Sequence, residues 1–231
     1  MRTLLILATV VLASCGDDAG MCGGEPPRSD VPVGHPLLNP DSPDLKVVPP
    51  DSFDLVLETT EGQVVIRVIR EWSPLGAYRF YNLARNGFYD ASQFFRVLPG
   101  FAVQFGLSGR PPLDRLWQDE TIPDDPQLVL NEAGTVAFAM AGPNTRTTQV
   151  FVNYGPNEIL DQQGFAPIGR VVNGMDALLR LHSGYGELQP QGTGPAYGCM
   201  LSHGNEYLSR RYPNLDRIES ASIIDYPQPA P

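Results

Sequence analysis

One stretch of the chain, residues 93–106 (QFFRVLPGFAVQFG), places two polar side chains inside otherwise apolar runs. Arg96 interrupts the first run and Gln104 interrupts the second, with a Pro-Gly turn between them. The pattern predicts strand, turn and strand. A fixed cation and an amide can bind a partner or stabilise charge, which is the chemistry these residues suggest. A lone arginine in a strand is nevertheless more often a structural residue that reaches solvent or pairs with a carboxylate.

Other kinds of site find little support in the sequence. The histidines, His35, His182 and His203, have no metal-ligand spacing, so no metal is expected. The segment GLSGR at 106–110 lacks the second glycine of a nucleophile elbow, and no glycine-rich phosphate loop follows a strand. No pair of acidic residues stands out as an acid–base couple. No cofactor is therefore expected, and the hydrolase and nucleotide-enzyme interpretations are weak.

The bulk composition fits one domain of ordinary size with appendages. The chain has 231 residues and a net charge of −10, which argues against a protein that tracks nucleic-acid phosphates. Glycine and proline, 23 of each, are spread along the chain and indicate many turns between short strands. The fold class predicted from these features is mainly β.

The elements that must position the two polar residues can be read from apolar periodicity. A hairpin is predicted over 53–69, and a helix follows from Ser73, its expected N-cap, to Gly87. Further strands are expected over 134–140, 148–154, 167–172 and 218–224, and further helices over 173–183 and near 205–211. A closed barrel with helices at its ends would leave no free strand edges.

The first residues, MRTLLILATVVLASC, resemble a targeting segment rather than part of the fold. The apolar run from Leu4 to Ala13 is too short to span a bilayer, and Leu-Ala-Ser-Cys matches a bacterial lipobox. That match predicts cleavage before Cys15, lipidation of its thiol and attachment to a membrane. An ordinary secretory signal with a chance cysteine is the alternative.

The domain organisation follows from this segment and from the Pro-, Gly- and Asp-rich stretch after it. We expect a signal peptide over 1–14, a flexible tether over 15–51, a folded domain over 52–227 and a tail over 228–231. Cys22 and Cys199 remain in an exported chain, which permits a disulfide without implying one.

Two segments, FFRVLPGFAVQFG (94–106) and FAMAGPNTRTTQVFVN (138–153), resemble the signature of the cyclophilin family of peptidyl-prolyl cis-trans isomerases. The resemblance runs from about Phe53 to at least Asp176. The segments 160–176 and 204–223 resemble the bacterial and related branches of that family. The resemblance implies a closed eight-stranded antiparallel β-barrel capped by two helices. It also implies an isomerase of X-Pro bonds whose partners are Pro-containing polypeptides.

The resemblance also assigns roles to single residues. It makes Arg96 catalytic, Gln104 a holder of that arginine and of the substrate backbone, and Phe101 the floor of the proline pocket. The other positions that it implies in substrate binding are Ala102, Ala139, Met140, Ala141, Gln149, Phe151, Ile159, Leu160 and Phe165. Several of these depart from the family pattern: Ala102 replaces a usual methionine, Met140 a common asparagine, and Ile159 a tryptophan of many eukaryotic members. Phe165 falls near a position that is often histidine.

Strand alternation supports part of this assignment without the resemblance. Phe94, Arg96 and Leu98 should share one face of their strand, and Ala102 and Gln104 should share a face of the next. One face of each strand can fill a barrel while the other lines an outer groove. This is how a cation and an amide can lie in apolar strands.

The sequence therefore predicts a monomeric prolyl isomerase that assists the folding of exported or envelope proteins. Its predicted location is a bacterial cell envelope, lipid-anchored and facing the periplasm or the exterior. A non-catalytic cyclophilin-like module that binds Pro-containing segments is the alternative, and an envelope spacer is a third reading.

Overall fold

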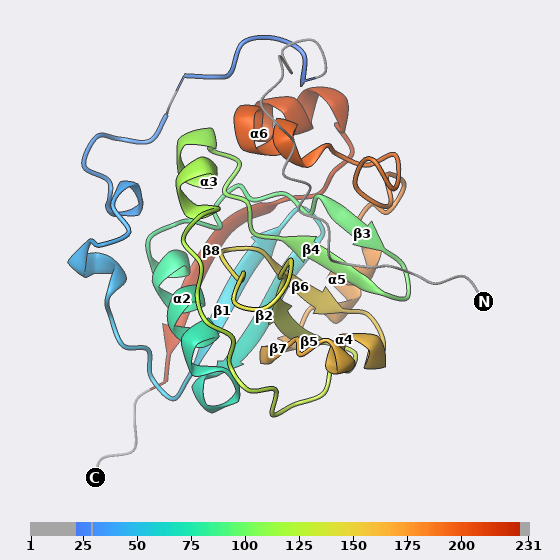
Figure 1. Ribbon diagram of the computed structural model, residues 1–231. Coiled ribbons are helices and arrows are strands. Elements are labelled where there is room, and N and C mark those ends of the chain that lie inside the picture. The colour runs from blue at the N-terminus through green and yellow to red at the C-terminus, as the bar shows by residue number, and fades with distance from the viewer. Residues whose placement is uncertain (1–21, 29, 227–231) are drawn as a thin grey trace.

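The computed structural model describes residues 22–28 and 30–226 of the chain (Figure 1). Within these ranges one antiparallel sheet of eight strands has the order β3-β4-β6-β5-β7-β2-β1-β8. The strands are β1 (Ser52–Thr59), β2 (Gly62–Ile69), β3 (Arg96–Leu98), β4 (Ala102–Phe105), β5 (Thr135–Phe138), β6 (Val150–Asn153), β7 (Pro167–Asn173) and β8 (Ile218–Asp225). The helices are α2 (Pro74–Arg85), α3 (Pro111–Trp117), α4 (Glu158–Gln162), α5 (Met175–Arg180) and α6 (Tyr197–Arg211). Short 3-10 turns lie at Pro36–Leu38, Pro43–Leu45 and Arg70–Trp72.

The sheet is a curled half-barrel, so the prediction of a closed barrel is wrong. The two outer strands, β3 and β8, form no ladder with each other. Their closest approach is an isolated bridge between Gln93 and Arg217, just before each strand begins. Strand β3 is only three residues long and pairs with β4. The mainly β fold class is confirmed.

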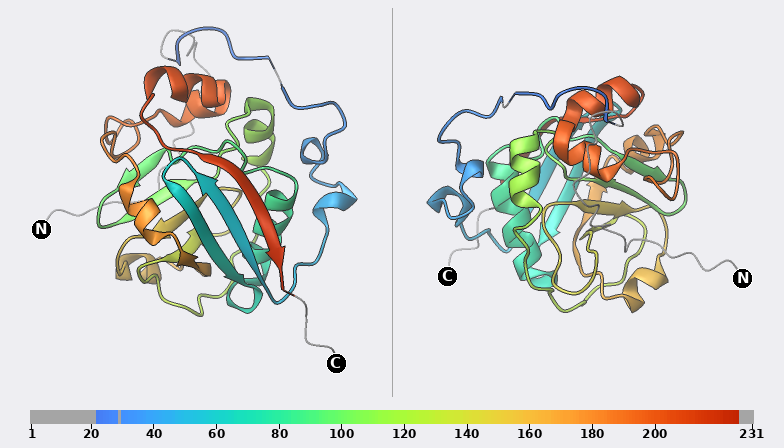
Figure 2. Two further views of the ribbon diagram at one scale, coloured as in Figure 1. Left: turned by 180° about the vertical axis from the view of Figure 1, so that it is seen from behind. Right: turned by 45° about the horizontal axis from the view of Figure 1, so that its top comes forward.

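The hairpin of β1 and β2 carries the alternation that its sequence predicts and forms one wall of the core. Leu55 and Leu57 of β1 and Val64 and Ile66 of β2 are fully buried. Helix α2 lies across the concave side of the sheet and adds Phe80 to the same core (Figure 2). Strand β2 starts at the turn with two exposed residues, Gly62 and Gln63, before its buried positions begin.

The start of α2 is capped differently from the expectation for Ser73. The Ser73 hydroxyl makes no capping bond and instead donates to a carboxylate oxygen of Asp125, 2.5 Å away. The same carboxylate accepts the backbone N–H groups of Leu75 (3.1 Å) and Gly76 (2.9 Å). Burial alone would raise the pKa of Asp125, but these hydrogen bonds and the charge of Arg146 hold that pKa below its ordinary value. A loop carboxylate therefore satisfies the free donors of the helix.

The described part of the expected tether packs against the domain. Leu37 is fully buried, and its carbonyl accepts the indole N–H of Trp117 at 2.9 Å. Further on, the Asn82 side chain pairs with the backbone of Val47, accepting its N–H at 3.0 Å and donating to its carbonyl at 2.8 Å. Residues 30–50 are thus held as an ordered strap, contrary to the prediction of a flexible segment.

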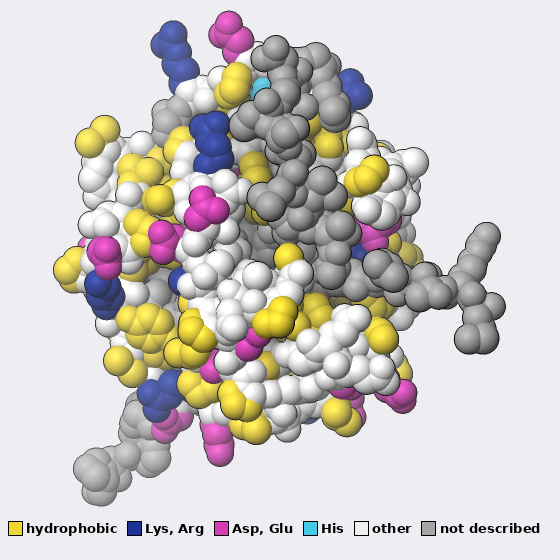
Figure 3. All heavy atoms as spheres, viewed as in Figure 1, with side chains coloured by type: hydrophobic (Ala, Val, Ile, Leu, Met, Phe, Trp, Pro, Cys, Tyr) yellow, Lys and Arg dark blue, Asp and Glu magenta, His cyan; other side chains and the backbone are white. Residues whose placement is uncertain are grey.

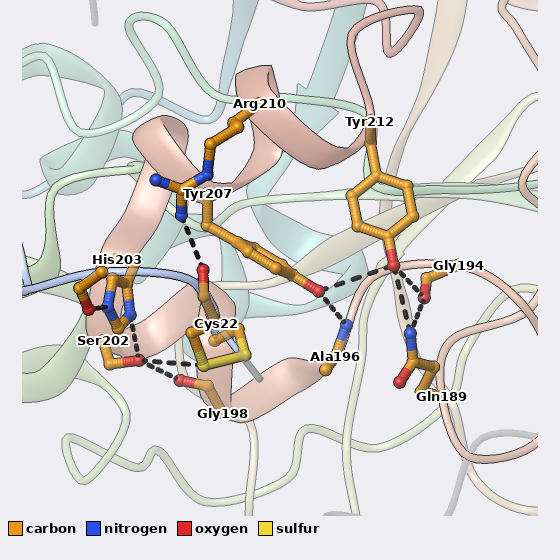
Figure 4. Close-up of a disulfide and its surroundings, with 12 residues drawn as sticks. Cys22, Gln189, Gly194, Ala196, Gly198, Ser202, His203, Tyr207, Arg210 and Tyr212 are labelled. Carbon is orange, nitrogen blue, oxygen red and sulfur yellow. Dashed lines mark hydrogen bonds between the residues drawn. A yellow bond between two sulfur atoms is a disulfide. The ribbon is translucent and has the colours of Figure 1, made fainter. Parts of the chain in front are cut away.

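Helix α6 lies beyond the edge of the sheet and is longer than the predicted helix near 205–211. It packs beside α3, and Gly204 interrupts it with φ 54°. A Cβ at Gly204 would lie 2.0 Å from the carbonyl oxygen of Gly109, so this close approach requires glycine. A disulfide joins Cys199 of α6 to Cys22 at the start of the described chain (Figure 4). The pairing that the sequence left open is therefore present.

Cys199→Ser should destabilise the folded chain, because the disulfide links residues 177 positions apart and restricts the unfolded state. Such a bridge typically contributes about 2–4 kcal/mol, which lowers Tm by on the order of 5–15 °C in a chain of this size. Thermal unfolding followed by circular dichroism measures the effect. Cys22→Ser should give the same loss and the double variant no further loss. A double variant that loses twice as much as either single variant would contradict a shared bridge.

Candidate active site

The outer faces of β3, β4 and β6 present a row of polar side chains that begins at Arg96. Arg96 lies opposite Gln104 in the β3–β4 register, and its Nη1 donates to the Gln104 side-chain oxygen at 3.4 Å. The Gln104 amide donates to Gln149 (3.0 Å), whose amide donates to the hydroxyl of Tyr197 on α6 (3.2 Å). Burial raises the pKa of Tyr197 to about 12, so this hydroxyl stays protonated at neutral pH.

The opposite faces of these strands fill the core, as alternation predicts for β4. Val103 and Phe105 are buried in the main core, while Ala102 and Gln104 face outward. The expectation that Phe94 shares the face of Arg96 is wrong, because Phe94 packs in the core with its ring centre 5.4 Å from that of Phe105. The strand begins only at Arg96, so the residues before it do not follow the strand period.

A cluster of apolar side chains lies beside the arginine. Its buried members are Ala102, Ala137, Phe151, Leu160 and Phe165, and its partly buried members are Phe101, Ala139 and Met140. The rings of Phe151 and Phe165 meet edge to face with centres 5.7 Å apart. The guanidinium carbon of Arg96 lies 5.7 Å from the centre of the Phe101 ring. The structure thus brings seven of the residues implied in binding into one cluster next to Arg96, together with Ala137.

Three of the implied binding residues lie outside this cluster: Gln149, which belongs to the polar row described above, Ile159 and Ala141. Ile159 is 45% exposed, whereas its neighbour Leu160 is fully buried. Ala141 is exposed, and its backbone N–H donates to the hydroxyl of Thr145 at 2.8 Å. Ile159 and Ala141 lie beyond the buried part of the pocket, where they can contact only a ligand that extends past it.

Glu187, a residue that no sequence pattern indicated, holds Arg96 from the other side. Its carboxylate accepts Nε and Nη2 of Arg96, both at 2.6 Å, in a two-pronged ion pair. Arg96 is only 4% exposed as a result. Burial would raise the pKa of Glu187, but the hydrogen bonds and the charge of Arg96 hold it below its ordinary value. The two residues are 91 positions apart, and Glu187 lies in a glycine- and proline-rich loop without a period, so the sequence offered no signal for this contact.

The arrangement can bind a small apolar group against Phe101 while a fixed cation lies beside it. Among the described residues no three His, Cys, Asp or Glu side chains are grouped to hold a metal ion. On the face in Figure 3, arginine and lysine side chains are scattered singly among carboxylates and do not form one basic patch.

The fold and the site define a half-barrel protein with an apolar side-chain cluster and an adjoining buried arginine. The family model of the cyclophilin type peptidyl-prolyl cis-trans isomerases matches residues 54–194. The chain belongs to this family, whose curated members are named as isomerases, and the prediction of an isomerase is confirmed at that level.

Several known proteins share this likeness. Peptidyl-prolyl cis-trans isomerase-like 1 of Gibberella zeae is 34% identical over 55% of this chain and 80% of its own length. The human protein of the same name is 32% identical over 59% of this chain and 86% of its own length. A solved cyclophilin type isomerase of Cryptosporidium parvum matches with a TM-score of 0.56, covering 76% of this chain and 99% of its own. At 18% identity that structural likeness shows the fold alone.

These relatives correct the predicted location. The Gibberella zeae, Bos taurus and Rhizopus delemar relatives are eukaryotic isomerase-like 1 proteins rather than lipoproteins of a bacterial envelope, so the envelope location is wrong. They also give no support to the bacterial-type branch. No helix in the described part of the chain is long and apolar enough to cross a membrane. The predicted signal peptide and the predicted lipidation site at Cys15 lie outside the described residues.

Phe101→Ala should weaken capture of an X-Pro peptide, because the ring forms the partly buried edge of the pocket. Burying such a side chain contributes about 1.5–3 kcal/mol, so kcat/KM should fall roughly 10- to 150-fold. A proline-isomerisation assay on a short peptide measures it. Leu179→Ala is the control, since Leu179 is 61% exposed on α5 away from the pocket cluster. Equal losses in both variants would show that Phe101 has no special role.

Proposed function

We propose that this chain accelerates rotation about X-Pro peptide bonds, with the proline ring in the apolar pocket and Arg96 as the stabilising donor. The observation that supports it most is the guanidinium of Arg96 held beside the ring of Phe101, at the edge of the pocket. Family membership supports the reaction, and the geometry supports these residue roles.

The chemistry needs little more than this arrangement. Rotation about an X-Pro bond is slow because its C–N bond has partial double-bond character, with a barrier of roughly 20 kcal/mol. In the twisted transition state the conjugation is lost, and the proline nitrogen becomes pyramidal and more basic. A donor fixed near that nitrogen stabilises the twisted state more than either planar state, and only such differential binding speeds the reaction. The apolar wall excludes water and strengthens the interaction.

The substrate class that we propose is a polypeptide segment containing X-Pro. The Cryptosporidium parvum relative has also been solved in the presence of the dipeptide Ala-Pro, which supports a proline-sized occupant for this kind of pocket. Ala102 and Phe151 belong to the apolar cluster on β4 and β6, and Ala102 adds little side-chain bulk to it. Residues that flank proline would lie nearer the exposed Ala141 and Ile159.

A second candidate is a module that binds Pro-containing segments without useful catalysis. The specific observation in its favour is the ion pair with Glu187, which engages two of the N–H donors of Arg96.

The predicted lipid at Cys15 remains a prediction about residues that the structure does not describe, and the activity proposed for the domain does not depend on it.

Arg96→Lys should abolish most isomerase activity while leaving the fold intact. An ammonium keeps the positive charge opposite Glu187 but cannot reproduce the planar fork of donors. Removing a preorganised transition-state donor typically costs about 10²–10³-fold in rate. The rate on a short X-Pro peptide and the Tm should be measured together. Arg67→Lys is the matched control, because Arg67 makes a similar two-pronged pair with Asp54, at 2.9 and 3.0 Å, on β1 and β2.

The outcomes separate the two candidates. A lower isomerisation rate in Arg96→Lys, with a rate in Arg67→Lys equal to that of the native protein, supports the isomerase. Native protein that binds X-Pro peptides without accelerating their isomerisation would favour the binding module. A variant at Arg96 as fast as the native protein would contradict the role of this residue.

A further inference from the structure

The partners of Arg96 determine which edge of its guanidinium faces the apolar cluster. An arginine has five N–H donors in a rigid plane. Glu187 takes one from Nε and one from Nη2, and Gln104 accepts one from Nη1. The Nη1 side is therefore the side that faces the outward row of β4 and β6, where the pocket residues lie. The carboxylate occupies the opposite edge and engages two of the five N–H donors.

The loop that carries Glu187 is wound tightly around it. The backbone N–H of Leu188 donates to the Glu187 carboxylate at 2.9 Å, and the N–H of Gly194 donates to the Glu187 carbonyl at 2.8 Å. A Cβ at Gly192 or Gly194 would lie 2.4 or 2.7 Å from that carbonyl oxygen. Only glycine fits at these two positions without moving the loop. The position of the carboxylate is therefore set by the backbone around it.

Helix α6 fixes this loop in turn, as Figure 4 shows. The Tyr212 hydroxyl accepts from the Gln189 amide at 3.1 Å and donates to the Gly194 carbonyl at 2.8 Å. The Tyr207 hydroxyl accepts the backbone N–H of Ala196 at 3.1 Å. Both tyrosines are buried, so these bonds are shielded from water. The loop has little freedom to withdraw Glu187 from Arg96.

We propose that Glu187 is a positioning residue for the reaction, and that it acts by holding the guanidinium of Arg96 in the orientation that faces the pocket. This inference rests on the proposed function. The alternative is an inhibitory role, or brake, in which the carboxylate lowers the rate by neutralising the charge of the arginine. Positioning is favoured because the nitrogen of a twisted X-Pro bond gains only a fraction of an elementary charge, whereas a donor misplaced by 1 Å can cost about 10²-fold in rate. An arginine without this partner would also be free to turn about its side-chain bonds.

Glu187→Gln is the principal variant, because it keeps the shape of the side chain and removes the charge. We expect kcat on a short X-Pro peptide to fall about 10- to 100-fold with KM little changed, since the pocket is untouched. Glu187→Asp keeps the charge with a shorter reach and should recover part of the lost rate. It also serves as the second variant if Glu187→Gln fails to fold.

A double-variant cycle tests whether Glu187 acts through Arg96. In an Arg96→Lys background, Glu187→Gln should change the residual rate less than about twofold, because coupled residues are not additive. A side-chain nitrogen NMR spectrum gives an independent readout, since the Nε–H of Arg96 should shift in Glu187→Gln. Asp54→Asn is the matched control: it breaks the similar pair with Arg67 and should leave kcat and KM unchanged.

Several results would overturn the inference. A Glu187→Gln protein that is faster than the native protein would identify a brake, and one that is equally fast would remove any role in the reaction. An equal loss of rate in the native and the Arg96→Lys backgrounds would indicate general damage to the loop. A native protein without isomerase activity would overturn the proposed function and this inference together. The other results would overturn only the role of Glu187, because in them the native protein is active.

Discussion

The structure depends on keeping one guanidinium buried beside an apolar pocket. A charge removed from water must be paired and hydrogen-bonded, or the cost of desolvation is large. Arg96 meets this requirement with a carboxylate on one edge and an amide on the other, and Phe101 lies under its cationic carbon. The pairing differs from a surface salt bridge, because Arg96 is almost inaccessible and Glu187 is about one-third exposed. The elements around the site supply these partners.

Each partner comes from a different part of the fold. Strand β3 is only long enough to place Arg96 opposite Gln104 before the chain turns away. The loop between α5 and α6 then covers the arginine and supplies Glu187. A closed barrel with a longer β3 would pair this edge with β8 instead.

The sequence predicts this site well where function depends on local pattern. The outward faces of β4 and β6, with Gln104 and Phe151, follow from strand alternation once the strands are recognised. The sequence does not predict contacts that depend on long-range packing. Phe94 precedes its strand and therefore turns inward, and the partnership of Arg96 with Glu187 has no periodic signal. The region rich in proline and aspartate before residue 51 resembles a tether by composition, yet a few buried side chains such as Leu37 suffice to fix it.

The support for the site extends beyond the part of the chain that defines the family. The family model ends at residue 194. Two supporting residues lie after it: Tyr197 on α6 accepts a hydrogen bond from Gln149, and Tyr212, next to α6, bonds to the loop of Glu187. That helix is itself joined to Cys22 before the matched region begins. Segments on both sides of the matched domain therefore meet at α6 and stabilise one wall of the site. A disulfide there stabilises the fold mainly by restricting the unfolded chain, so it can support the wall without adding a group to the site.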